Sequence, residues 1–102
     1  KNIIISTLKE KSIIPETYNL SVAYPNPFNP VTHFNFSNPK QSDVKISVYD
    51  LQGRLVEEII NQSVPPGTFE VKWDARNYSS GIYFINMIAD DFSTTQKITL
   101  LK

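Results

Sequence analysis

The sequence predicts an all-β fold, an antiparallel β-sandwich of about seven short strands. Three observations support this prediction. Apolar and polar residues alternate with a period of two over most of the chain from residue 18 onward, which is typical of half-buried strands. Turn-forming residues separate these runs at short intervals. No stretch keeps the period of an amphipathic helix.

The predicted strands follow one another along the chain at residues 20–23, 32–36, 44–50, 55–62, 69–74, 82–89 and 92–102. Within most runs the larger apolar side chains fall on one face. We expect this face to form the core, with Phe34, Phe36, Val44, Ile46, Val48, Phe69, Val71, Trp73, Tyr83, Ile85, Met87, Ala89, Phe92, Ile98 and Leu100.

Two runs depart from simple alternation. The run 55–62 is less regular, and its adjacent Glu57 and Glu58 suit an edge strand. The run 82–89 is apolar at nearly every position, but Asn86 marks its outward face. That face also carries Ile82, Phe84 and Ile88, and Tyr49 is outward on its own run. We expect these side chains to cover neighbouring strands or to pack under the N-terminal segment; the alternative is an exposed interaction site.

Turn chemistry predicts the connections. Residues 50–53, DLQG, fit a hairpin with Gly53 in a left-handed conformation. Residues 64–67, VPPG, fit a type II turn with Pro66 and Gly67 at its centre. A loop opened by Asp74 ends at Gly81.

The stretch YPNPFNP, residues 24–30, cannot be helical, because each proline fixes φ and lacks an amide hydrogen. The prolines also push the preceding residues toward extended geometry. We expect a stiff crossover between two strands, with Phe28 plugging one end of the sandwich. The structural motif comprises this stretch and the turn glycines: Tyr24, Pro25, Asn26, Pro27, Phe28, Asn29, Pro30, Gly53, Gly67 and Gly81.

Residues 1–17 have no sustained period. We expect them to be a linker from an upstream domain, with the sandwich spanning residues 18–102. The alternative is that residues 3–5, all isoleucine, form an additional edge strand.

Composition excludes several classes of function. Ten basic residues balance ten acidic ones, so nothing in the charge predicts binding to nucleic acid or to an anionic membrane. No apolar run approaches the ~20 residues of a membrane span. The chain has no cysteine, which excludes disulfides and thiolate chemistry.

The polar residues do not form a recognisable catalytic, cofactor or metal site. His33 is the single histidine and alternates toward solvent. Glu57 and Glu58 are adjacent, so along a strand they point to opposite faces, which is wrong for a paired-carboxylate site. Asp90 and Asp91 form one acidic pair in a turn, far from a calcium ligand set. There is no glycine-rich phosphate loop and no G-x-S-x-G motif. We expect a protein that is not an enzyme and needs no cofactor.

Four segments carry a resemblance to a known family. They are LSVAYPNPFNPVTHFNF, VKISVYDLQGRLV, PPGTFEVKWDARNYSSGIYFINM and the terminal QKITLLK. In this order they resemble the type A C-terminal sorting domain of the bacterial type IX secretion system. The pattern is also similar to the immunoglobulin-like domain of flagellar hook-capping proteins. The resemblance covers about residues 18–102.

The resemblance implies a seven-stranded immunoglobulin-like sandwich at the end of a larger cargo protein. It implies export through the periplasm to the cell surface or medium, recognition by the type IX machinery, and removal by a sortase-like protease. The cut would fall between Ser12 and Leu20. By the same resemblance the recognition signal is the end of the chain: Lys97, Ile98, Thr99, Leu100, Leu101 and Lys102.

Two other functions stay open at this point. One is a structural interaction module, such as a hook-capping or stalk domain. The other is a carbohydrate-binding module, which would need a planar row of exposed aromatics; its candidates are Tyr49, Tyr78 and Phe84.

Overall fold

The computed structural model describes residues 4–7 and 14–102. The described residues form strands and no helix. The strands are β1 (Ile4–Thr7), β2 (Asn19–Leu20), β3 (Val31–Asn38), β4 (Ser42–Asp50), β5 (Leu55–Val64), β6 (Gly67–Asp74), β7 (Gly81–Ala89) and β8 (Phe92–Leu100).

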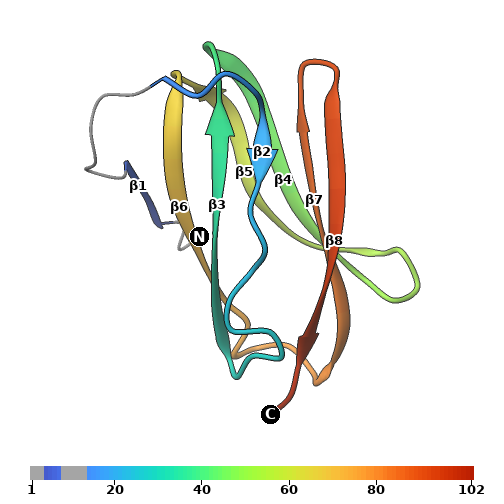
Figure 1. Ribbon diagram of the computed structural model, residues 1–102. Helices are drawn as coiled ribbons and strands as arrows, with labels where there is room; N and C mark the ends of the chain where they lie inside the picture. The colour runs from blue at the N-terminus through green and yellow to red at the C-terminus, as the bar shows by residue number, and fades with distance from the viewer. Residues whose placement is uncertain (1–3, 8–13) are drawn as a thin grey trace.

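The strands build two sheets that face each other (Figure 1). One sheet has the order β1-β6-β3-β2, and the other has the order β5-β4-β7-β8. Neighbouring strands within each sheet are antiparallel. The predicted all-β sandwich is therefore confirmed, with β2–β8 as its seven strands.

The first strand, β1, is additional to those seven. It pairs with β6 at the edge of its sheet, with Ile4 opposite Lys72 and Thr7 opposite Phe69. The alternative of an extra N-terminal strand thus matches the structure, about one residue later than expected. Residue 3 and residues 8–13 lie outside the described residues. The role of residues 1–17 as a linker to a cargo domain stays a prediction.

The core lies between the sheets and contains the side chains that the alternation assigns to it. All fifteen predicted core residues are buried except Phe92, which is half-buried. Aromatic rings concentrate at one end, where Trp73 packs against Phe28 and Tyr83 with centroid separations of 5.7 and 5.8 Å. This end is the one that the proline stretch was expected to close.

The irregular strand β5 is an edge strand, as predicted. Its register against β4 shifts twice, since Ile46 pairs with Ile60 and Ser47 with Glu58, and Val48 pairs with Glu57 and Tyr49 with Leu55. Each shift leaves one β5 residue, Ile59 or Val56, without a partner, which is a β-bulge. The first bulge explains why both Ile59 and Ile60 are buried.

One half-buried carboxylate ties β5 to the opposite sheet. The carboxylate of Glu57 accepts hydrogen bonds from Trp73 Nε1 and from the Tyr78 hydroxyl, both at 3.0 Å. Burial raises the pKa of Tyr78, and the hydrogen bond to Glu57 raises it further. Glu57 therefore has a structural role, since its carboxylate joins the two sheets.

Two of the predicted turns have different outcomes. Gly53 has φ of +84°, and the β4–β5 hairpin closes with hydrogen bonds from Gly53 N to Asp50 O and from Asp50 N to Arg54 O. The predicted left-handed glycine is confirmed. The type II turn is wrong: Gly67 has φ of +142°, far beyond the value near +80° that such a turn needs. Gly67 already belongs to β6 and pairs with Asn38, and its φ lies in a range that residues with a side chain rarely adopt.

Candidate recognition surface at the terminal strand

The six predicted signal residues lie on β8 and just after it. Ile98 and Leu100 are fully buried in the core. Lys97, Leu101 and Lys102 are exposed, and Thr99 is half-buried. Two residues of the predicted signal therefore belong to the hydrophobic core, and the other four are accessible to a partner.

The outward side chains of β8 continue a row across the second sheet. Lys97 lies opposite Phe84 of β7, which lies opposite Tyr49 of β4. Thr99 lies opposite Ile82. Tyr49, Ile82 and Phe84 are half-buried, as expected if they cover neighbouring strands, whereas Ile88 is 42% exposed. The expected packing under the N-terminal segment lies outside the described residues.

The outer edge of β8 is closed by the proline stretch. Phe28 N donates to Thr99 O at 2.9 Å, and Leu101 N donates to Phe28 O at 3.0 Å, which makes a short parallel bridge. Beside it, the Asn26 side chain accepts from Thr99 N at 3.0 Å and donates to Lys97 O at 3.2 Å. Asn26 thus bonds to β8 as the peptide group of a neighbouring strand would. The two stretches singled out in the sequence form one unit.

Phe28 is 2% exposed and packs on Trp73, so the predicted plug is confirmed. The segment around it is fixed by hydrogen bonds to its carbonyl groups: the Thr32 side-chain Oγ1 donates to Pro25 O, and the backbone Ala75 N donates to Pro30 O, both at 2.8 Å. The peptide bonds before Pro25, Pro27 and Pro30 are cis. Tyr24, Pro25, Asn26, Pro27 and Asn29 are exposed.

Residues 18–23, which directly precede the proline stretch, follow β8 along the rest of its length. The amide of Gln96 bridges two backbone groups, accepting from Ala23 N at 2.9 Å and donating to Ser21 O at 2.7 Å. Farther up, the Tyr18 ring stacks on Phe92 at 5.7 Å. The Tyr18 hydroxyl donates to the Asp90 carboxylate at 2.7 Å, which lowers the pKa of Asp90, and the nearby Lys40 lowers it further. Figure 1 shows β2 and the chain after it running to the end of the molecule at which β8 ends.

The last residues are also anchored to the β6–β7 loop. Lys102 N donates to Ser80 Oγ at 2.9 Å, and Lys102 Nζ donates to Arg76 O at 2.6 Å. Arg76 is held in turn by two hydrogen bonds to the Asp74 carboxylate, which lower the pKa of Asp74 and raise that of Arg76. Within the described residues, neither Lys97 nor Lys102 forms an ion pair with a carboxylate.

The other sequence candidates do not assemble into a chemical site. His33 is exposed, and its Nδ1 lies 3.8 Å from a Glu70 carboxylate oxygen. The residues that the structure describes contain no cluster of three or more potential metal ligands, and none of them forms a helix that could cross a membrane. The three aromatics considered for carbohydrate binding do not form an exposed row. Tyr49 and Phe84 lie opposite each other but are half-buried on the outer face of the second sheet, and Tyr78 packs on Trp73.

Sequence reasoning missed three residues of the surface. Asn26 was expected to belong to a structural motif, not to bond to the terminal strand, and Gln96 and Ser80 were not singled out. The separation between partners explains this, because Asn26 and Thr99 are 73 positions apart. Asn26 lies between two prolines and Gln96 lies between Thr95 and Lys97, so the local sequence at neither position indicated hydrogen bonding at a sheet edge.

Comparison with known proteins agrees with this architecture. No curated protein sequence matches the chain. A similar solved structure is described as PorZ, an essential bacterial surface component of the type IX secretion system of Porphyromonas gingivalis. It is 20% identical, with a TM-score of 0.57, over 85% of this chain and 12% of that one, so the likeness supports the fold alone.

The family model described as the secretion system C-terminal sorting domain matches residues 22–101. The match begins just before the proline stretch and ends with the residues that bond to it. The resemblance stated from the four sequence segments is thereby confirmed, and this chain belongs to the family of secretion system C-terminal sorting domains.

Proposed function

We propose that this domain is a non-catalytic address that directs an attached cargo protein through the type IX secretion system to the cell surface. The observation that carries the proposal is the family match over residues 22–101, which spans both the proline stretch and the terminal strand. The cargo would precede the domain in the same polypeptide, and the protein would pass through the periplasm before export.

The readable part of the address would be the exposed side of the chain end, formed by Lys97, Thr99, Leu101 and Lys102. Leu101 is 55% exposed, and the two lysines lack ion-pair partners among the described residues. An exposed leucine between two lysines is suited to a receptor that offers an apolar contact flanked by carboxylates; Lys102 Nζ would keep or exchange its hydrogen bond to Arg76 O. Ile98 and Leu100 would act indirectly, by holding β8 in the core.

Removal by a sortase-like protease would require accessible backbone before the first strand of the sandwich. Residues 14–17 lie outside any strand, and Ile14, Glu16 and Thr17 are exposed. This supports a cleavage position in the described part of the range between Ser12 and Leu20. Residues 12 and 13 lie outside the described residues.

The proposal is tested by fusing residues 1–102 to a reporter in a host that carries the secretion system. Deleting residues 97–102 would also remove Ile98 and Leu100 from the core, so its effect would mix recognition with folding. The sharper variant is Lys97→Glu with Lys102→Glu, matched to Lys45→Glu with Lys72→Glu, since all four lysines are exposed. We expect the reporter to be lost from the cell surface with the first pair alone. Equal export of both pairs, with both folded, would contradict the proposed signal.

The structural-module alternative makes the opposite prediction for the same fusion. A hook-capping or stalk domain would give no transport of an attached reporter, whatever the charge at residues 97 and 102. An unmodified fusion that remains inside the host would therefore favour that alternative.

A further inference from the structure

A bulge beside β3 presents two apolar side chains to solvent. Ser21 and Asn35 are joined by hydrogen bonds from Ser21 N to Asn35 O and from Asn35 N to Ser21 Oγ, both at 2.8 Å. Tyr24 and His33 exchange two backbone hydrogen bonds, of 2.9 and 3.1 Å. Between these pairs, Val22 and Ala23 lie opposite the single residue Phe34. Bulges of this kind redirect side chains and are frequent near functional sites.

The bulge sends Ala23 into the core and Val22 outward. Ala23 is 2% exposed, whereas Val22 and Tyr24 are each 79% exposed. No other large hydrophobic residue with a described side chain is as exposed as these two. The Gln96 amide holds the bulge by bonding to Ala23 N and Ser21 O. Two exposed apolar side chains are therefore held on a fixed backbone, which reduces the entropy lost when a ligand binds.

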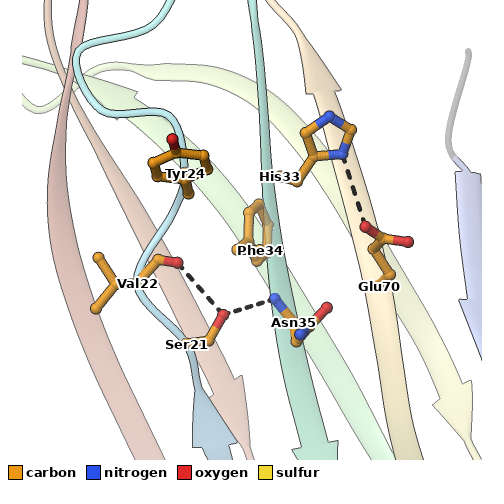
Figure 2. A pocket seen from close by; sticks show the side chains of 7 residues that line it. All are labelled: Ser21, Val22, Tyr24, His33, Phe34, Asn35 and Glu70. Atoms are coloured by element: carbon orange, nitrogen blue, oxygen red, sulfur yellow. Dashed lines mark hydrogen bonds and ion pairs between the residues drawn. The ribbon is translucent and has the colours of Figure 1, made fainter. Parts of the chain in front are cut away.

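These side chains form one wall of a shallow pocket of about 370 Å³. Figure 2 shows Tyr24 and Val22 on one side, His33 and Glu70 on the other, and Phe34 between them. Asn35 and Ser21 complete the lining. The volume is near the lower end of the range for ligand sites, so the pocket suits a ligand of one or two rings.

The polar groups of the pocket favour an uncharged ligand that carries hydroxyl groups. Glu70 faces His33 across 3.8 Å, so an anion would meet the carboxylate and a cation would meet the imidazole when it is protonated. The imidazole, the carboxylate and the Asn35 amide offer both donors and acceptors. The Tyr24 ring offers a flat apolar face. A pyranose has this combination, with hydroxyls around its rim and an apolar C–H face.

We propose that this pocket is a binding site for a single pyranose unit, stacked on Tyr24 and hydrogen-bonded by Asn35 and Glu70. The site differs from the row of aromatics considered from the sequence, since it uses one ring and a polar strand face. It does not depend on the proposed sorting function, because its residues are distinct from Lys97, Thr99, Leu101 and Lys102.

The test is an NMR titration of the ¹⁵N-labelled domain with D-glucose, D-galactose and D-mannose, each added separately. We expect saturable shifts in the amides of Val22, Tyr24, His33, Asn35 and Glu70 with at least one of these sugars. Tyr24→Ala should weaken that binding at least about tenfold, which is about 1.4 kcal/mol. Tyr24→Phe keeps the ring and should retain most of it. Leu55→Ala removes an exposed side chain of the other sheet and should leave the affinity unchanged.

Three results would overturn the proposal. The first is that none of the three sugars gives saturable shifts in these amides. The second is equal affinity in Tyr24→Ala and the unmodified domain, with both shown to be folded by their spectra. The third is that components of the secretion machinery shift these amides while the sugars do not, which would make the pocket a protein-docking surface.

Discussion

The two edges of the β5-β4-β7-β8 sheet differ in how they are closed. Along β8, residues 18–28 supply backbone and side-chain hydrogen bonds, stacking by Tyr18 and the buried ring of Phe28. Along β5, the described residues include no further strand. That edge instead has two bulges and the adjacent Glu57 and Glu58, features that discourage pairing with another chain.

The difference identifies the β8 edge as the place where folding affects the residues of the proposed signal. The β5 edge is protected by local features of one strand, so changes there act locally. The β8 edge is completed by a segment about 70 residues earlier in the chain, as in the contact between Asn26 and Lys97, which are 71 positions apart. Changes to Asn26 or Phe28, the two residues of the proline stretch that bond to the terminal strand, should therefore affect that strand.

The largest effect is expected for Phe28→Ala. Removing a fully buried aromatic side chain that packs on Trp73 leaves a cavity and should lower the free energy of unfolding by about 3–5 kcal/mol. Chemical denaturation measures it. Tyr24→Ala in the same stretch removes an exposed ring and serves as the control. A loss under about 1 kcal/mol for Phe28→Ala would refute its role as a plug at the closed edge.

At the β5 edge, Glu57→Ala should lower the free energy of unfolding by about 1–3 kcal/mol, because the buried Trp73 Nε1–H loses its acceptor. Glu58→Ala is the matched control, since its carboxylate accepts only a 3.3 Å contact from Asn61 at the surface. Denaturation of both variants gives the comparison. If the two substitutions cost the same, the hydrogen bonds of Glu57 do not stabilise the fold.

Asn26→Ala should lower the free energy of unfolding by about 1–2 kcal/mol, because two hydrogen bonds to β8 are lost. The more specific readout is amide hydrogen exchange. Thr99 N should lose protection directly, and Leu101 N should follow as the Phe28 bridge loosens. Asn29→Ala lies between the same prolines and should leave both amides protected. Unchanged protection in Asn26→Ala would show that β8 needs no neighbour on that side.

The smallest effect concerns pH. The pKa of Asp90 is lowered from 3.8 chiefly by the hydrogen bond from Tyr18. The folded pKa therefore lies below the unfolded one, so the contribution to stability is present above the unfolded pKa and is lost as pH falls through the folded pKa. Thermal unfolding between about pH 5 and pH 2 should show a shallower decline in Asp90→Asn than in the unmodified domain. The same slope in Asp90→Asn and in the unmodified domain would contradict this coupling.

Local patterns predicted most of the fold. The alternation placed Phe34, Ile46 and Ile98 on the buried face of their strands, because the side-chain period of a strand depends only on its backbone. Gly53 was predicted correctly for a similar reason, since the tight hairpin that it closes involves only neighbouring residues.

The failures share a different cause. Gly67 belongs to β6 and not to a turn centre because its pairing with Asn38 extends the β3–β6 ladder to that point, and the β5 bulges depend on the partner strand β4. The pairing of the proline stretch with β8 requires the whole sandwich. The candidate signal could be located from the sequence, but which of its residues a partner can reach depends on the closure of that edge.

The bridge between Phe28 and residues 99–101 also sets a condition on biosynthesis. Ribosomes make the proline stretch early, yet its hydrogen-bonding partners are among the last residues of the domain to emerge. Contacts this distant in sequence form late in folding. Nascent or prematurely terminated chains that lack residues 98–101 would leave Phe28 without its bridge and the core without Ile98 and Leu100. Closure of the β8 edge therefore requires a domain that has been synthesised through residue 101.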